Sequence, residues 1–168
     1  MADSVTVIGI DPGSRHTGWG VVREVSGVLR LVDCGVCSPR AKDSFADRLA
    51  AIYHGLSAVL ARLEPEEAAI EQVFTAHNAA TALKLGQARG VAVAACAARG
   101  IPVLDYEPTL VKKSLVGTGR AEKTQVSFMA GRLLNVKPDW SADTGDALAI
   151  AICHLTMRRY AMSIGMQK

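Results

Sequence analysis

The sequence predicts one α/β domain with a mixed five-stranded sheet flanked by helices. Its 168 residues, 49% of them apolar, can bury one core well but are too few for two ordinary domains, so residues 1–168 are expected to fold as one unit. The order of hydrophobic patterns indicates the α/β class, because three strand-like segments and a helix precede alternating strands and helices. The strands are predicted at residues 5–10, 17–24, 28–37, 68–73 and 101–106. The helices are predicted at residues 44–63, 78–100, 108–115, 121–134 and 141–160.

Turn and capping residues set the limits of these elements. The short turn at residues 26–27 joins the second and third strands, so the first three strands are expected to form an antiparallel meander. Ser44 and Asp47 are spaced as a capping box for the first helix. Asn78 opens a helix rich in Ala and Gly, and Ser141 is placed to cap the last helix.

The charge is distributed unevenly along the chain. The net charge of +3 says little about partners, but residues 108–137 hold six basic residues and one acidic residue. Residues 75–100 add three basic residues and no acid, whereas residues 43–71 hold six acids and two arginines. Such segregation suits an anionic polymer partner. Solvated helix faces explain the charge pattern equally well when it is taken alone.

The cysteine positions argue against a metal site at the CxxC pair, and the hydropathy argues against a membrane protein. Cys34 and Cys37 form a CxxC pair, but residues three apart on a strand point to opposite faces, so their sulfur atoms would not share a metal. Cys96 and Cys153 fall in apolar helical patterns, where cysteine behaves as a small buried hydrophobe. No signal peptide and no window of roughly 18 apolar residues is present. We therefore expect a soluble, cytoplasmic protein with no membrane association.

Four carboxylates occupy positions where an ordinary core would not place them. Asp11 ends an apolar strand, and Glu71 interrupts another. Asp143 and Asp146 lie in the first turn of the last helix and share one face, because they are three residues apart. The helix N-terminus stabilises nearby acids by about 0.3 to 1 kcal/mol, which is too little to keep four clustered carboxylates ionised. Divalent cations would do so, and oxygen ligands suit Mg²⁺ or Mn²⁺.

Such a cluster is typical of phosphoryl transfer, in which two cations ionise a water and stabilise the leaving oxygen. Each acid taken alone has a simpler explanation. Asp143 and Asp146 suit the first turn of any helix, and Asp11 suits the turn that follows it. Glu71 is harder to explain, because an acid inside an apolar strand is rarely buried without a partner. Four acids at strand or loop edges are left out of the cluster: Asp33, Asp105, Glu107 and Asp139.

Four sequence blocks resemble, in order and spacing, the signatures of RuvC-type Holliday junction resolvases. They are IGIDPGSRHTGWG (8–20), AIEQVF (69–74), ALKLGQARG (82–90) and DTGDALAIAICH (143–154). The resemblance spans nearly the whole chain and implies a ribonuclease H-like fold. It also implies a crossover junction endodeoxyribonuclease that resolves Holliday junctions in recombination and DNA repair. The expected products are paired symmetric nicks with 5′-phosphate and 3′-hydroxyl ends.

The resemblance assigns roles to individual residues. Four carboxylates match the catalytic set that binds two Mg²⁺ ions, with Mn²⁺ as a substitute: Asp11, Glu71, Asp143 and Asp146. Lys112 and Lys123 match basic positions that contact the DNA backbone, although solvated lysines are the simpler alternative. Phe74 matches an aromatic that stacks on unpaired bases at the junction centre, with a core position as the alternative. Lys84, in the basic stretch before residue 100, completes the expected DNA-binding set.

The resemblance also implies partners. The family acts as a homodimer with the helix at about residues 78–99 in the interface, where Ala and Gly would permit close approach. A dimer suits a four-way DNA junction, because a two-fold symmetric substrate is nicked on two opposed strands. Handover from the branch-migration proteins RuvA and RuvB is also implied. The role of His16, which lies near Asp11, is left open.

Two other functions remain as alternatives. A pre-ribosomal RNA nuclease on the same fold would share the strand of Asp11 and a later acid. A non-catalytic junction-binding module would not need all four carboxylates, so the intact set argues against it. The blocks at residues 69–74 and 143–154 favour the resolvase over the RNA nuclease.

Overall fold

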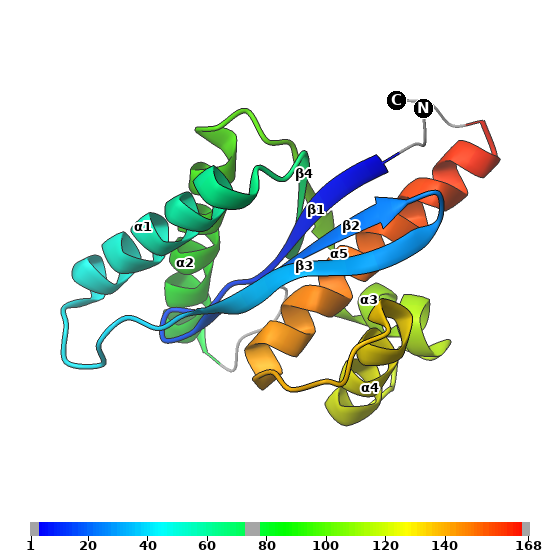
Figure 1. The fold of residues 1–168 in the computed structure, drawn as a ribbon. Helices are drawn as coiled ribbons and strands as arrows, with labels where there is room; N and C mark the ends of the chain where they lie inside the picture. The colour runs from blue at the N-terminus through cyan, green and yellow to red at the C-terminus, as the bar shows by residue number, and fades with distance from the viewer. Residues whose placement is uncertain (1–3, 73–77, 166–168) are drawn as a thin grey trace.

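The structure, a computed structural model, describes residues 4–72 and 78–165. In this part of the chain the strands form one sheet of five, ordered β3-β2-β1-β4-β5 (Figure 1). The strands are β1 (Ser4–Asp11), β2 (Thr17–Val25), β3 (Val28–Cys37), β4 (Glu67–Glu71) and β5 (Val103–Tyr106). The helices are α1 (Phe45–Leu63), α2 (Ala79–Ala97), α3 (Pro108–Val116), α4 (Lys123–Leu134) and α5 (Ala142–Ser163).

The sheet is mixed, as predicted. β1 pairs antiparallel with β2, and β2 with β3, so the expected meander is confirmed. β4 pairs parallel with both β1 and β5. The predicted elements are all present, and their limits differ by only a few residues; β4, for example, ends at Glu71 rather than at residue 73. Ser44 caps α1 by accepting a hydrogen bond from the Asp47 N–H at 3.1 Å.

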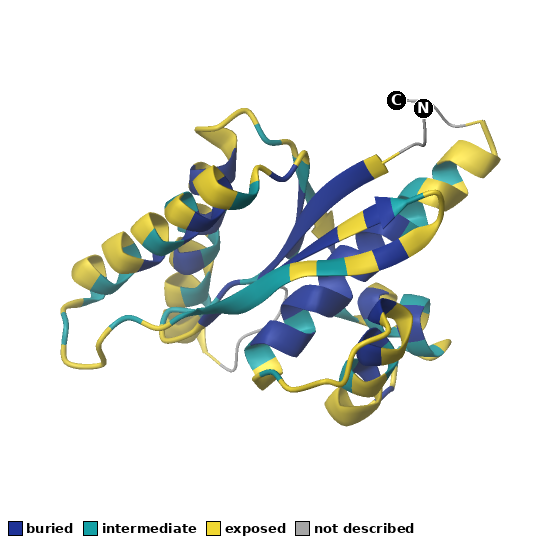
Figure 2. Ribbon diagram, in the orientation of Figure 1, coloured by how far each residue is buried: buried dark blue, intermediate teal, exposed yellow. Residues whose placement is uncertain are grey.

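Helices cover both faces of the sheet (Figure 1). α1 and α2 pack on one face, around a core that includes Ile8 and Ile10 of β1. α3, α4 and α5 pack on the other, around a core that includes Val5 and Val7. Figure 2 shows β1 and the first half of α5 buried, whereas α1 and α4 expose their outer sides. The strand alternation therefore separates two cores, and every second residue of β1 faces α5.

The helix α5 lies unusually close to β1 and β2. A Cβ added to Gly9 would lie 2.0 Å from the Ala147 carbonyl oxygen, and one added to Gly18 would lie 2.1 Å from that of Asp143. Both distances are far inside van der Waals contact, so only glycine permits this approach. The two glycines thus fix the height of α5 above the sheet and the place where the helix begins.

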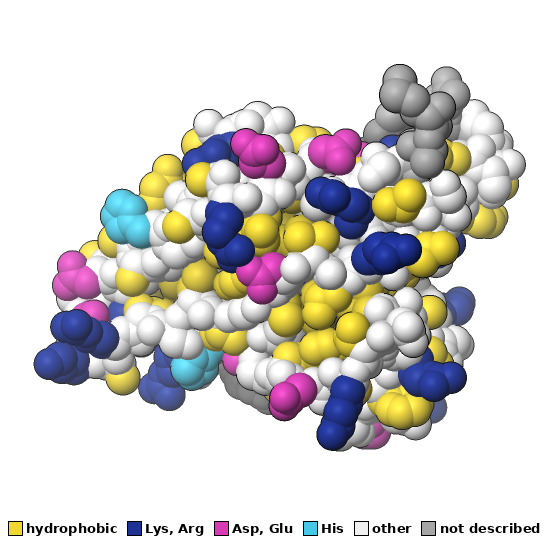
Figure 3. Space-filling view, viewed as in Figure 1, with side chains coloured by type: hydrophobic (Ala, Val, Ile, Leu, Met, Phe, Trp, Pro, Cys, Tyr) yellow, Lys and Arg dark blue, Asp and Glu magenta, His cyan; other side chains and the backbone are white. Residues whose placement is uncertain are grey.

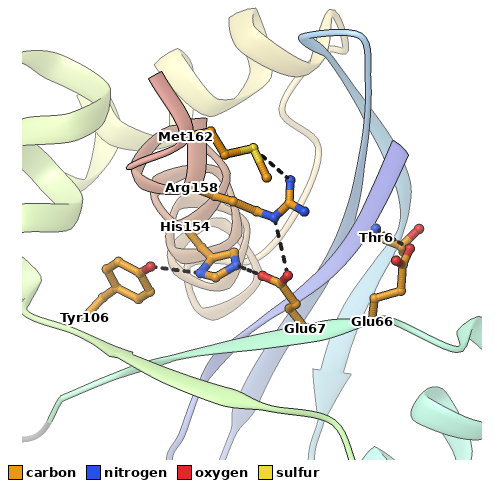
Figure 4. A network of polar contacts seen from close by, with 7 residues as sticks. All are labelled: Thr6, Glu66, Glu67, Tyr106, His154, Arg158 and Met162. Atoms are coloured by element: carbon orange, nitrogen blue, oxygen red, sulfur yellow. Dashed lines mark hydrogen bonds and ion pairs between the residues drawn. The ribbon is translucent and has the colours of Figure 1, made fainter. Parts of the chain in front are cut away.

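A buried polar network ties α5 to β4 and β5 (Figure 4). His154 is 2% exposed; its Nδ1 lies 2.8 Å from the Tyr106 hydroxyl and its Nε2 lies 2.5 Å from Glu67 Oε2. Arg158 donates to the other oxygen of Glu67 at 3.3 Å. These contacts hold the helix in one register along the strand. Burial raises the pKa of Tyr106 to about 12, with the charge of Glu67 adding to the effect.

The cysteines behave as predicted, with all four in the free thiol form. Cys34 packs against the core below α5 and Cys37 against the core below α1, so the CxxC pair points to opposite faces of β3. Within residues 4–72 and 78–165, no helix is long and apolar enough to cross a bilayer.

Candidate active site

Two strands deliver the first two carboxylates. In β1, Val5, Val7 and Gly9 face α5, and Asp11 continues this alternation. In β4, Glu67 contacts α5 and Glu71 lies four residues later on the same face. Because β1 and β4 run parallel with Ile10 paired to Ile70, the next residue of each strand is one of these acids. The sheet thus brings Asp11 and Glu71 together at the carboxyl ends of neighbouring strands.

The start of α5 delivers the other two, Asp143 in the first turn and Asp146 just beyond it. Ser141 caps this helix, and its hydroxyl accepts a hydrogen bond from the Thr144 N–H at 3.3 Å. Asp143 and Asp146 follow within one turn, and the close approach of Gly18 positions the backbone of Asp143. Asp146, Ile150 and His154 are spaced four residues apart, so they lie along one side of α5. The His154 network therefore secures, two turns away, the same side of the helix that carries Asp146.

The acids open into a cavity of about 230 Å³ between the sheet and the three helices α3, α4 and α5. Its polar wall consists of Asp11, Glu71, Asp146, Lys112 and Lys123. Its apolar wall consists of Pro108, Val111, Val126, Ala149 and Ile150. The cavity therefore combines three carboxylates and two ammonium groups with an apolar wall.

The acids in the cavity perturb one another. Burial, followed by the charges of Glu71, Asp146 and Asp143, raises the pKa of Asp11 from 3.8 to about 7, and the charge of Lys123 partly offsets this rise. The pKa of Glu71 is also raised, first by burial and then by Asp146. Without a compensating cation, these acids are unfavourable as a set of full negative charges. A site with this electrostatic profile and access to solvent is a candidate for function.

Lys123 supplies part of the missing positive charge. Its ammonium forms a hydrogen-bonded ion pair with the Asp146 carboxylate. The described residues contain no group of three acidic, histidine or cysteine side chains that would hold a metal ion as they stand. The acids are close enough to affect one another's charge but are not closed into a ligand cage.

The structure places the predicted residues unequally. The charge of Asp143 raises the pKa of Asp11, but Asp143 does not line the cavity. Lys84 lies on the exposed surface of α2, away from the cavity lining. Phe74 lies outside the described residues. His16 is exposed, and its Nδ1 lies 3.0 Å from the Ser38 hydroxyl.

The acids left out of the cluster have other contacts or positions. Asp33 pairs with Arg62 on the surface, and Asp105 pairs with Arg89.

On the face seen in Figure 3, Lys and Arg side chains are interspersed with Asp and Glu. The charge segregation along the sequence is therefore not reproduced as one patch on that face.

The apolar half of the cavity was not predicted from the sequence. Val111 and Val126 belong to α3 and α4 at spacings that any core-facing residue would show. No local signal distinguishes a residue that lines a cavity from one that fills a core, because the difference depends on how the helices pack.

Known proteins are similar to this chain in sequence and fold. The family model of the crossover junction endodeoxyribonuclease RuvC matches residues 7–154. A protein of that name from Oleidesulfovibrio alaskensis is 71% identical over 92% of this chain and 93% of its own. One from Nitratidesulfovibrio vulgaris strain Hildenborough is 63% identical over 99% of both.

Solved structures agree with this similarity. Thermus thermophilus RuvC superposes with a TM-score of 0.84 at 34% identity, over 93% of this chain and 96% of that one. The same protein in complex with Holliday junction substrate gives a TM-score of 0.88 at 35% identity, over 94% and 96%. The predicted ribonuclease H-like fold is thereby confirmed. The chain belongs to the RuvC family of crossover junction endodeoxyribonucleases.

Proposed function

We propose that this chain is an endonuclease that resolves four-way DNA junctions by hydrolysing phosphodiesters at the Asp11 cavity. The observation that carries the proposal is the convergence of acids from β1, β4 and α5 with Lys112 and Lys123 at one open cavity. Membership of the RuvC family supplies the substrate class, because a relative at 35% identity was solved with Holliday junction substrate. Recombination and DNA repair are the processes that need this activity.

The residues fit a divalent cation. The donors are carboxylate oxygens alone, which Mg²⁺ and Mn²⁺ prefer. The pKa of Asp11 is raised first by burial and then by neighbouring acids, so a bound cation would stabilise its charged form. Asp11, Glu71 and Asp146 would hold two Mg²⁺ ions, with Asp143 completing the set of carboxylates. Mn²⁺ would substitute. Once bound, these ions supply the Lewis acidity that activates a water and stabilises the leaving oxygen.

The chain's own residues orient the DNA for the reaction. Lys112 and Lys123, at the cavity wall, would hold the phosphate that is cut and offset the charge that develops on it. A water attacks the phosphorus, the bond from phosphorus to the 3′ oxygen breaks, and that oxygen takes up a proton. The products are a 5′-phosphate and a 3′-hydroxyl. Lys84 and Phe74 complete the proposed DNA contacts, Phe74 by stacking on unpaired bases.

A homodimer would supply the two opposed nicks that a two-fold symmetric junction needs. The exposed side of α2 supports this part of the proposal. Leu83 is 69% exposed there, and a Cβ added to Gly86 or Gly90 would meet nothing within 4 Å. A second α2 helix would pack closely on such a surface. RuvA and RuvB are the proposed partners that deliver the junction.

The test is cleavage of a synthetic mobile four-way junction, beside a linear duplex and an RNA–DNA hybrid, in Mg²⁺, Mn²⁺ or EDTA. Glu71→Gln removes one charge from the cavity, and Glu64→Gln makes the same chemical change at the exposed C-cap of α1. We expect paired nicks on the junction that require metal, persist in Glu64→Gln and disappear in Glu71→Gln. Junction binding is expected to survive in Glu71→Gln.

Two results would contradict the proposal in different ways. Cleavage of the RNA strand in preference to the junction would favour the RNA nuclease. Junction binding without nicks in any metal would favour the non-catalytic module.

A further inference from the structure

Lys123 occupies the cavity in an arrangement that its position on the helix does not favour. It is the first residue of α4, where the helix dipole disfavours a cation. Glu122 and Gln125 form a capping box, in which the Glu122 N–H donates to Gln125 Oε1 at 2.9 Å, so the backbone at Lys123 is fixed. The ammonium nevertheless reaches across to α5 and pairs with Asp146. The acids of the cavity, rather than α4, therefore hold the side chain in place.

The charges around the ammonium explain why it is held. The hydrogen bond to Asp146 raises the pKa of Lys123, and the charges of Asp146, Asp11 and Glu71 add to the effect. Lys112 lines the same cavity and lowers the pKa of Glu71, but its ammonium makes no hydrogen bond to a side chain among the described residues. Lys123 is thus the lysine whose ammonium is bonded to the acid cluster, while Lys112 acts through space.

The same contact stands in the way of a metal ion. A divalent cation and the Lys123 ammonium both require the oxygens of Asp146, and each supplies the positive charge that the cluster lacks. Release of the lysine would be easy, because its side chain is 69% exposed while that of Asp146 is 21% exposed. An ion pair with one exposed partner is weak and readily exchanged.

We propose that Lys123 is an internal counter-ion that holds the acid cluster until a divalent cation displaces it, and that the displaced ammonium is then free to bind a DNA phosphate. The inference rests on the proposed function, because it assumes that the cluster binds Mg²⁺. It adds an order of events: metal first releases the lysine, and the lysine then adds a phosphate contact. Metal and DNA binding are then coupled through one side chain, and the coupling is reciprocal.

The first test follows the ammonium itself in the full chain without DNA. Lysine NH₃⁺ groups labelled with ¹⁵N give proton–nitrogen correlation signals when a hydrogen bond slows proton exchange, and Lys123→Arg assigns the signal of Lys123. We expect a Lys123 signal in EDTA that is lost or shifted at saturating Mg²⁺. Asp146→Asn removes the partner and is expected to lose the signal already in EDTA. A Lys123 signal that is unchanged at saturating Mg²⁺ would overturn the inference.

The second test compares Mg²⁺ affinity by calorimetry in Lys123→Met and Lys112→Met, which remove the same charge from the same cavity. Displacement predicts that Lys123→Met binds Mg²⁺ roughly five-fold more tightly than Lys112→Met. Equal affinities would mean that both lysines act only through space and would overturn the inference. Absence of Mg²⁺ binding in every chain would overturn the proposed metal site as well. Release of Lys123 by Mg²⁺ in a chain that cuts no junction would support the inference and contradict only the proposed function.

Discussion

Replacement of Asp11 by Asn should stabilise the metal-free protein. Burial and neighbouring acids raise the pKa of Asp11 from 3.8 to about 7, so the folded state disfavours its charged form. One pKa unit corresponds to about 1.4 kcal/mol, and the full difference therefore corresponds to about 4 kcal/mol. Water in the open cavity reduces this figure, and we expect Asp11→Asn to gain about 2 kcal/mol at pH 8. For a chain of this length that is a rise of roughly 4 to 8 °C in Tm.

The stability gained by Asp11→Asn should increase as the pH rises. Below pH 3.8 the carboxyl is protonated in both states, so Asp11 has no destabilising effect. Between pH 3.8 and about 7 the folded state keeps a proton that the unfolded state has released, so stability falls as the pH rises. Above about pH 7 the destabilisation is complete. Asn does not ionise, so the difference in Tm between Asp11→Asn and the unmodified chain should grow from pH 5 to pH 8.

The assay is thermal unfolding followed by circular dichroism in EDTA, at fixed protein concentration. Asp139→Asn, in the exposed loop before α5, serves as the control and should leave Tm nearly unchanged at every pH. Added Mg²⁺ should reverse the order, because a cation that binds the folded state stabilises the unmodified chain by about 2.7 kcal/mol at one hundred times Kd. Equal Tm values for Asp11→Asn and the unmodified chain across this pH range would refute the argument from burial.

Three further changes test the framework that positions the acids, each by thermal unfolding and by Mg²⁺ titration. Gly18→Ala should lower the free energy of unfolding by roughly 3 kcal/mol and weaken Mg²⁺ binding, because the added Cβ would lie 2.1 Å from the Asp143 carbonyl oxygen. An unchanged Tm would show that α5 can move away freely. His154→Ala should lower the free energy of unfolding by about 2 to 4 kcal/mol, because it removes the hydrogen bonds to Tyr106 and to Glu67. A loss below about 1 kcal/mol would mean that the network adds little stability. Ser141→Ala should cost about 1 kcal/mol by removing the cap of α5, whereas Ser141→Asp should restore it.

Much of the fold was determined by local sequence patterns. The alternation in β1 and the turn at residues 26–27 predicted the meander, and Ser44 and Ser141 marked the starts of α1 and α5. These features depend on neighbours in sequence, so they can be predicted without knowledge of the packing. The same logic identified Glu71, because an acid within an apolar strand is conspicuous wherever the strand lies.

The site residues were singled out in the sequence, but their electrostatic state was not. The acid at position 11 has an ordinary local context, and only the assembly of β1, β4 and α5 buries it beside three other acids and raises its pKa. The contact of Lys123 with Asp146 joins residues 23 positions apart in the chain and likewise has no local signature. The sequence could indicate which acids lie near one another, whereas burial and the charge interactions among them could not be predicted.

Sequence by itself thus determined which strands and helices form, and which acids would be out of place in an ordinary core. The tertiary structure decided how closely α5 approaches the sheet, which side chains line the cavity and which lysine pairs with Asp146. The physical reason is the distance along the chain over which each kind of interaction acts. Turns, caps and alternation act between residues close in the chain, whereas desolvation and charge coupling depend on distances that are set only when Gly9 and Gly18 let the helix settle on the strands.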